Sequence, residues 1–231
     1  MSFLTPRLFS LASLITEGEV VADIGTDHAY LPIYLAKDGK AKKIYATDVA
    51  LKPLTVAKNN LASFGVADKV ETILADGIEW TIPNNIKLDS CIIAGMGSTS
   101  ILDILKKDNE NIYSYIIASN TYLEPIRKWT KEKKYFVEKE IIVEDNKIIY
   151  EIIKINKFAG TKIKSKKDIL FGPLLVRDEK NKLFLQKWLE EEEKLFKLLQ
   201  QIPKKDKKYK ETLKRKNEIS KLLKRRTLIN E

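Results

Sequence analysis

The sequence predicts an α/β protein with a mostly parallel, seven-stranded sheet that ends in an antiparallel hairpin, followed by a helical hairpin. Three observations carry this prediction. Apolar strand-like runs alternate with helical segments over the first two-thirds of the chain. The last two of these runs are separated by only two residues. The final third is strongly basic and places its apolar residues at helical spacing.

The composition is that of a globular protein, with 44% hydrophobic residues in a chain of 231. A single cysteine, Cys91, excludes an intrachain disulfide, and one cysteine with one histidine argues against a zinc site. No apolar run reaches the roughly 20 residues that span a bilayer, and the N-terminus lacks the pattern of a signal peptide. We therefore expect a cytoplasmic protein with neither a metal nor a membrane partner. The working expectation for its oligomeric state, which these observations do not determine, is a monomer.

The first helix is predicted to begin at Pro6, with Thr5 as its N-cap, and to end at Gly18. Short apolar runs then predict five strands, at 20–24, 44–47, 70–74, 90–94 and 112–118. Helices between them are predicted up to Ala36, at 53–64, at 98–106 with Ser98 as cap, and at 124–134. Strands that alternate with helices pair in parallel through right-handed crossovers. Their continuous apolar runs are typical of strands covered on both faces.

Two further strands are predicted at 136–144 and 147–154. Asp145-Asn146 joins them, and a two-residue link of this kind suits a tight hairpin turn. The sheet is therefore expected to end in an antiparallel hairpin.

Charge is unevenly distributed along the chain. Residues 1–156 hold 19 Lys/Arg and 21 Asp/Glu, a net charge of −2, whereas residues 157–231 hold 23 and 11, a net charge of +12. A uniform genomic preference for lysine would not produce this asymmetry. A polyanionic partner, above all a nucleic acid, explains it better.

The basic part is predicted to form two antiparallel helices that Pro203 separates. The second, from Lys204 to Arg226, carries 12 Lys/Arg against three acids. A solvated face balanced by Glu190–Glu193 accounts for only part of this excess. The same acidic residues interrupt the apolar seam of the hairpin, which argues against a membrane-surface helix. We expect phosphate contacts here. The candidate residues are Lys204, Lys205, Lys208, Arg215 and Lys216.

The turn after the first strand indicates the class of ligand. It contains Gly25, Thr26, Asp27 and His28 in place of the G-x-G-x-x-G of a dinucleotide site, and Asp27 would repel a pyrophosphate. An acidic turn suits a cationic ligand without phosphate, and S-adenosylmethionine has these properties. Asp48, at the end of the second strand, is placed to accept hydrogen bonds from two ribose hydroxyls.

Two motifs then identify a family resemblance. The run Asp23-Ile24-Gly25-Thr26-Asp27-His28-Ala29-Tyr30-Leu31-Pro32, together with Ala94-Gly95-Met96-Gly97, closely resembles the bacterial tRNA (adenine-22-N1)-methyltransferase (TrmK) family. The resemblance continues through Ile126-Arg127-Lys128-Trp129, Tyr150-Glu151-Ile152-Ile153 and Phe171-Gly172-Pro173.

The resemblance implies an S-adenosylmethionine-dependent enzyme that methylates N1 of adenine 22 in tRNA. It implies a Rossmann-like class I methyltransferase domain, residues 1–160, and a helical, antiparallel coiled-coil-like domain for tRNA binding, residues 161–231. The cofactor residues that it implies are Asp23, Gly25, Asp27, His28, Asp48, Val49, Asp76, Gly77, Ala94, Gly95 and Met96.

The family's Gln-Pro-Asn segment stands here as Ala118-Ser119-Asn120. We therefore expect Asn120 to contact the target base by accepting from its exocyclic N6 amine. Methyl transfer to N1 needs alignment and exclusion of water more than a strong base. Asp27 is the second catalytic candidate, because a carboxylate stabilises the positive charge that develops on the base.

The base must leave its tRNA contacts to enter a pocket, so an aromatic side chain is expected to stack on it. Tyr30 and Tyr122 are the candidates by position, and Arg7 is a candidate for a phosphate near the pocket mouth. Two other functions stay open on the residues alone. One is a methyltransferase that acts elsewhere on RNA or on a non-RNA substrate, and the other is a non-catalytic RNA-binding protein.

Overall fold

The computed structural model describes residues 4–227 and divides into two compact units, Met1–Val176 and Arg177–Glu231. The sequence placed the boundary after residue 160. The intervening segment belongs with the sheet because Thr161 bridges Val137 of a sheet strand, and Leu170 and Phe171 are buried.

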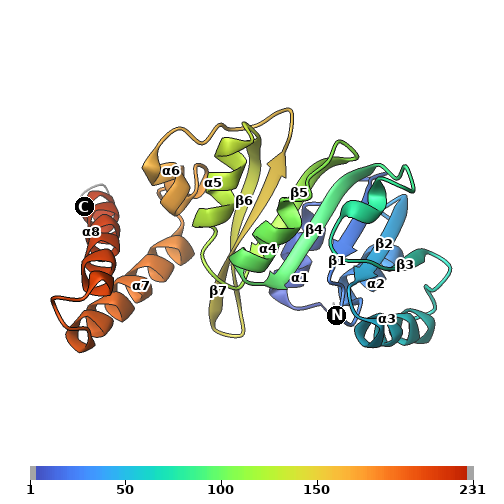
Figure 1. Ribbon diagram of the computed structural model, residues 1–231, viewed down its shortest axis with the longest axis horizontal. Coiled ribbons are helices and arrows are strands. Elements are labelled where there is room, and N and C mark those ends of the chain that lie inside the picture. Colours follow the sequence, from blue (N-terminus) through green and yellow to red (C-terminus); the bar gives the residue numbers. More distant parts are fainter. Residues whose placement is uncertain (1–3, 228–231) are drawn as a thin grey trace. The chain divides into compact units, whose positions relative to one another are not determined.

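The first unit contains one seven-stranded sheet with the order β3-β2-β1-β4-β5-β7-β6 (Figure 1). The first five strands pair in parallel, and β7 pairs antiparallel with both β5 and β6. The predicted fold class is therefore confirmed. The strands are β1 (Val20–Ile24), β2 (Lys43–Asp48), β3 (Val70–Leu74), β4 (Leu88–Met96), β5 (Ile112–Ser119), β6 (Phe136–Asp145) and β7 (Ile148–Asn156).

Helices cover both faces of this sheet (Figure 1). One core lies under α1–α3 and the other under α4 and α5, because alternate strand residues point to opposite faces. Val21 belongs to the first core, for example, and Ala22 to the second. The helices are α1 (Pro6–Ser13), α2 (Tyr30–Asp38), α3 (Leu51–Ser63), α4 (Ser98–Leu105), α5 (Glu124–Glu132) and α6 (Lys166–Phe171), with short 3-10 turns at η1 (Glu79–Thr81) and η2 (Leu175–Arg177).

Helix ends follow the sequence in part. Thr5 caps α1, and its hydroxyl accepts from the Leu8 amide at 3.4 Å, but the helix ends at Ser13, before Gly18. The predicted cap of α4 is wrong. Gly97 holds the N-cap position, and the amide of Ser98 donates to Oγ1 of Thr121 at 2.9 Å.

The hairpin turn lies one residue later than predicted. β6 extends through Asp145, so the two turn residues are Asn146 and Lys147, with φ of +51° and +63°. Two consecutive positive φ values are those of a type I′ turn, whose twist matches the flanking strands. Asn adopts this region readily, whereas Lys does so under the constraint of the strand register.

Helix α6 was missed, because the lysine-rich segment before it reads as a linker. Its start carries a full capping box: Ser165 Oγ accepts from the Asp168 amide at 3.1 Å, and Asp168 Oδ2 accepts from the Ser165 amide at 2.9 Å. Gly172 ends the helix with φ of +86°. A Cβ there would lie 2.5 Å from Glu140 Oε1 and 2.7 Å from Arg127 Nη2, so this position needs glycine.

A buried ion cluster joins three of the segments that carried the family resemblance. Arg127 of α5 is 1% exposed and donates from Nη2 to Glu151 at 2.6 Å and from Nε to Glu140 at 2.9 Å. Glu140 also accepts from the amides of Leu174 and Leu175, just after the Phe171-Gly172-Pro173 segment. The cluster therefore ties α5, β6, β7 and the segment after α6 together.

The second unit is built from α7 (Lys182–Gln201) and α8 (Lys207–Thr227). The side chain of Asn181 caps α7, and the chain reverses around Pro203. Glu192 of α7 contacts Ser220 and Lys216 of α8, so the second helix folds back along the first. The buried side chains are Phe184, Trp188, Leu195, Thr212, Ile219, Leu222 and Leu223. The sequence spacing places Tyr209, Leu213, Ile219 and Leu223 along one side of the second helix, but Leu213 is exposed, so this pattern is met only in part.

Cys91 lies in the middle of β4 and has no exposed surface. Its strand neighbours are Ala22 of β1 and Tyr115 of β5. Within residues 4–227, no helix has the length and hydropathy needed to cross a membrane. The same residues contain no group of three His, Cys, Asp or Glu side chains arranged to hold a metal ion.

Candidate active site

The candidate site lies at the carboxyl ends of β1, β2, β4 and β5. The sheet order places β1 between β2 and β4, so the connections from β1 and β4 leave in opposite directions at this point. Ligands of open α/β sheets bind at such a switch point. The predicted cofactor residues that follow these strands are therefore brought to one edge of the sheet.

The turn after β1 has an unusual backbone conformation. Gly25, Asp27 and Ala29 have φ values of +73°, +51° and +56°. The amides of Gly25 and Thr26 both donate to the carbonyl of Thr47, at 2.9 and 2.8 Å, which holds the turn against the end of β2. Positive φ at two non-glycine residues carries strain, and such strain is found at ligand sites.

Two cavities lie around this turn and share Gly25. The first, of about 230 Å³, is lined by Arg7, Leu8, Asp23, Gly25, Thr26, Asp27, His28, Tyr30, Leu31, Ala94 and Gly95. The second, of about 300 Å³, is lined by Ile24, Gly25, Val49, Ala75, Asp76, Gly77, Met96, Ser100, Asp103, Ile104 and Lys107. Ten of the eleven predicted cofactor residues line one cavity or both.

Asp23 is the buried carboxylate of the first cavity. It is 7% exposed and accepts from Thr26 Oγ1 at 2.7 Å. Desolvation raises the pKa of Asp23 from its ordinary value of 3.8 to about 6, and the nearby charge of Asp48 adds to this rise against the hydrogen bond from Thr26. A cationic ligand group would compensate this carboxylate.

Asp48 is the one predicted cofactor residue that lines neither cavity. Its two carboxylate oxygens accept from the backbone amides of Asp27, at 3.3 Å, and Ala50, at 3.0 Å. Each oxygen keeps a second lone pair for a hydroxyl group. The next residue, Val49, is 68% exposed and lines the second cavity.

Two carboxylates, Asp76 and Asp103, line the second cavity together with Lys107. Lys107 Nζ lies 3.1 Å from Asp76 and 2.9 Å from Glu79. These hydrogen bonds raise the pKa of Lys107, so the amine stays charged. Sequence reasoning missed Lys107, Ser100 and Ile104. The signal for the latter two is their spacing of four on α4, which starts directly after Ala-Gly-Met-Gly.

His28, the only histidine, lies beside Asp27 and Tyr30 at the edge of the first cavity. Its Nε2 is 3.6 Å from the Asp27 carboxylate, and its ring stacks on Tyr30 with centroids 5.6 Å apart. All three side chains are solvent-accessible, and Tyr30 is 42% exposed. This arrangement offers an aromatic surface and a carboxylate to a ligand that enters from solvent.

Asn120 follows β5 and joins the first cavity through two of its lining residues. Its Nδ2 donates to the Gly95 carbonyl at 2.7 Å, and its Oδ1 accepts from Arg7 Nη1 at 3.4 Å. Asn120 itself is exposed and does not line the cavity. Tyr122 is 41% exposed and lines neither cavity, whereas Tyr30 lines the first.

Apart from Arg7, which lines the first cavity, the predicted phosphate-binding residues belong to the second unit. Lys204 and Lys205 lie in the turn before α8 and not on the helix, and both are exposed, as is Lys208. Arg215 and Lys216 are half-buried, and Lys216 Nζ lies 3.6 Å from Glu192. The charge of Lys216 is thus partly compensated within the helical hairpin.

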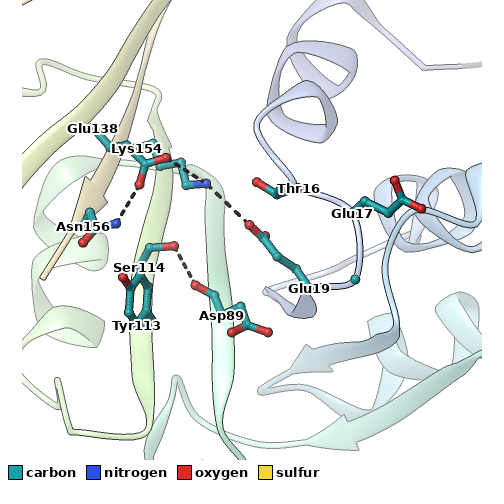
Figure 2. A pocket seen from close by; sticks show the side chains of 10 residues that line it. Thr16, Glu17, Glu19, Asp89, Tyr113, Ser114, Glu138, Lys154 and Asn156 are labelled. Carbon is teal, nitrogen blue, oxygen red and sulfur yellow. Dashed lines mark hydrogen bonds and ion pairs between the residues drawn. The ribbon is translucent and has the colours of Figure 1, made fainter. Parts of the chain in front are cut away.

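A third cavity, of about 390 Å³, lies at the other edge of the sheet and contains none of the predicted site residues (Figure 2). Lys154 extends across it, with Nζ 3.2 Å from Glu138 and 3.6 Å from Glu19 (Figure 2). The same amine donates to the carbonyl of Leu14 at 3.0 Å. These contacts hold the chain between α1 and β1 against β7.

Replacing Gly25 by alanine is expected to weaken binding of S-adenosylmethionine, the cofactor predicted from the sequence, at least ~10-fold. A Cβ at Gly25 would stand where the two cavities meet and would lie 2.5 Å from Cε of Met96, so this side chain, which lines the second cavity, must shift. The positive φ of +73° adds about 1 kcal/mol of backbone strain. Calorimetric titration with the cofactor measures the affinity.

Gly39→Ala is the matched control. Gly39 has φ of +72°, and a Cβ there meets nothing within 4 Å. It should lower the melting temperature by a similar amount and leave the affinity unchanged. Equal affinities for the two variants would contradict the assigned position of Gly25.

The arrangement suits a ligand with an amino-acid end and a nucleoside end. The buried carboxylate of Asp23 lies in the first cavity, whereas the second is lined by apolar side chains together with Asp76, Asp103 and Lys107. Gly25, which lines both cavities, stands where the two ends would meet. The buried carboxylate of Asp23 and the two cavities that share Gly25 therefore fit S-adenosylmethionine.

Comparisons with known proteins agree with this geometry. A model of the tRNA (adenine(22)-N(1))-methyltransferase family matches residues 21–225. The Bacillus subtilis tRNA (adenine(22)-N(1))-methyltransferase is 32% identical over 197 residues, which cover 81% of each chain.

Two solved structures are similar over almost the full length. The structure of M. capricolum TrmK in complex with S-adenosyl-homocysteine has a TM-score of 0.86 at 36% identity and covers 96% of this chain and 98% of that one. Streptococcus pneumoniae Sp1610 in complex with S-adenosyl-L-methionine has a TM-score of 0.78 at 29% identity, with coverage of 94% and 98%.

Proposed function

Because this chain belongs to the TrmK family of tRNA (adenine(22)-N(1))-methyltransferases, we propose that it transfers a methyl group from S-adenosylmethionine to N1 of adenine 22 in tRNA. The observation that carries this proposal is the pair of cavities that meet at Gly25, lined by the residues of both motifs. Similar proteins were solved with S-adenosyl-homocysteine and S-adenosyl-L-methionine.

The cofactor, when bound, would supply a methyl group bonded to a positively charged sulfonium sulfur. When the methyl group is transferred, its bond to sulfur breaks and the sulfur becomes a neutral thioether. The protein must hold the donor and the base in line and exclude water from between them. Asp23 would hold the ammonium, Asp48 would accept from the ribose hydroxyls, and Asp76 would accept from the adenine amine of the cofactor. Met96 lines the second cavity next to Gly25, the residue that the two cavities share.

On the substrate side, the lone pair of N1 forms the new bond, and the base becomes positively charged. Asp27 lies at the cavity with a solvent-accessible carboxylate and stabilises that charge. Tyr30 offers a ring for stacking, and Asn120 offers Oδ1 to the N6 amine. No proton needs to leave the base, because N1 of adenine carries none at neutral pH.

The basic helical hairpin is assigned to the tRNA backbone. Lys204, Lys205 and Lys208 are exposed and can contact phosphates. The charge of Lys216 is partly compensated by its ion pair with Glu192. Such contacts fix the position of the RNA without reading its sequence. The cytoplasmic location and the monomeric state expected from the sequence stay part of this proposal.

The test uses radiolabelled S-adenosylmethionine with two tRNA transcripts that differ only at position 22. Label is expected on the transcript with adenine there, and at least ~100-fold less on the transcript with guanine, because guanine carries a proton on N1 and a carbonyl at C6. Nuclease digestion and chromatography of the product should give 1-methyladenosine.

Each other outcome contradicts a defined part of the proposal. Equal label on both transcripts would discard position 22, and label on neither, with the cofactor bound, would discard tRNA as the acceptor. Failure to bind the cofactor in calorimetry would discard the methyltransferase assignment itself.

A further inference from the structure

The amide of Asn120 has a defined orientation, because its two partners have opposite requirements. A backbone carbonyl can only accept, so the atom that faces Gly95 O at 2.7 Å must be Nδ2. A guanidinium can only donate, so the atom that faces Arg7 must be Oδ1. The backbone amide of Asn120 also donates to the carbonyl of Met96 at 2.8 Å.

Arg7 is in turn held by the β6–β7 hairpin. Its guanidinium lies over the ring of Tyr150, 4.9 Å from the centroid, and its Nε is 4.0 Å from Oδ2 of Asp145, which is 7% exposed. Arg7 stands in the first turn of α1, which Thr5 and Pro6 fix. Its side chain is 21% exposed and lines the first cavity.

We propose that Arg7, held by Tyr150 and Asp145, is a positioning residue that keeps Oδ1 of Asn120 in place to accept from the N6 amine of the target adenine. The inference rests on the proposed function and deepens it. Asn120 Oδ1 has a second lone pair beside the one that Arg7 uses. An acceptor fixed in this way favours the amine of adenine and disfavours the carbonyl of guanine.

The test combines protein variants with a tRNA that lacks the amine. Wild type and Arg7→Met are compared at saturating cofactor on adenine-22 tRNA and on the same tRNA with purine at position 22. Purine differs from adenine in the basicity of N1 as well, but that difference is common to both proteins and cancels in the cycle. The measured quantity is kcat/KM, together with kcat and KM separately.

When purine replaces adenine 22, kcat/KM of the wild type is expected to fall at least ~10-fold more than kcat/KM of Arg7→Met. On adenine-22 tRNA, kcat/KM of Arg7→Met should be ~10-fold below that of the wild type, mainly through kcat. Removing the amine should lower kcat/KM of this variant little further. Tyr150→Leu should follow Arg7→Met, whereas Tyr150→Phe keeps the ring beneath the guanidinium and should restore the discrimination. Melting temperatures check that all variants are folded.

Three results would overturn the inference. If the loss caused by Arg7→Met and the loss caused by removing the amine multiply, Arg7 and the amine act independently. A rise in KM alone, equal for both tRNAs, would assign Arg7 to a tRNA phosphate. Weaker cofactor binding by Arg7→Met would assign it to the carboxylate of the cofactor. Failure of the proposed function is distinct, since wild type would then not methylate adenine-22 tRNA at all.

Discussion

Asp23→Asn is expected to abolish most cofactor binding and, at the same time, to raise the melting temperature. The carboxylate lines the first cavity, where it is placed to pair with a cationic ammonium. Loss of a buried charge-assisted contact weakens binding by roughly 10- to 100-fold. Calorimetric titration at pH 7.5 measures the affinity, and methyl transfer should fall with it.

The stability gain follows from the pKa of Asp23, which burial raises from 3.8 to about 6. A carboxyl group with a raised pKa favours the folded state below pH 4 and loses that contribution as pH rises through 6. Asparagine carries no charge to desolvate, and its amide oxygen can still accept from Thr26. We expect a gain on the order of 1–3 kcal/mol in the free energy of unfolding at pH 7.5, which vanishes near pH 4.

The pH dependence and a control separate this explanation from a general surface-charge effect. Cofactor binding by wild type should weaken as pH falls through about 6, because protonated Asp23 no longer pairs with the ammonium. Asp38→Asn, at the exposed end of α2, should change neither affinity nor stability. An Asp23→Asn protein that binds the cofactor as wild type does would refute the assignment.

Arg127→Met should give the largest loss of stability, about 3–5 kcal/mol. Methionine fills similar space but leaves the carboxylates of Glu140 and Glu151 buried without their cation. For a chain of this length, such a loss lowers the melting temperature by about 10 °C. Chemical denaturation followed by circular dichroism measures it.

Lys128→Met is the matched control on the next residue. Lys128 is exposed and pairs with Glu124 at 3.0 Å, a surface pair that contributes at most ~0.5 kcal/mol. Adding Glu151→Gln to Arg127→Met removes one of the unpaired charges and should recover part of the loss. Equal destabilisation by Arg127→Met and Lys128→Met would show that the buried cluster is not what stabilises this region.

The sequence predicted all seven strands, because buried parallel strands are continuous apolar runs with sharp polar ends. β1 and β3 matched in both bounds, and β2 differed by one residue at each end. Errors arose where a local preference was overruled. Asp145-Asn146 resembles a turn, but the ladder continues to Asp145↔Ile148 and moves the turn to Asn146-Lys147. Helix α6 had a readable signal in Ser165 and Asp168, which the surrounding lysines obscured.

The site was predictable where a residue ends a strand, and not where it comes from elsewhere in the chain. Asp23 and Gly95 follow from their places in the strand pattern. The contact between Arg7 and Asn120 joins residues 113 positions apart, and no periodicity reports it. Arg127 was noticed only within a motif, and its two buried partners could be found only in three dimensions.

The interior position of Cys91 has a practical consequence for measuring how this protein opens. The chain has one thiol, on a strand flanked by β1 and β5. Burial raises the pKa of that thiol, so it has little thiolate to react. A thiol reagent can label Cys91 only after the middle of the sheet separates, and fraying at the ends does not expose it. The rate at which Cys91 is labelled therefore reports how often the sheet opens, and no second thiol contributes to the signal.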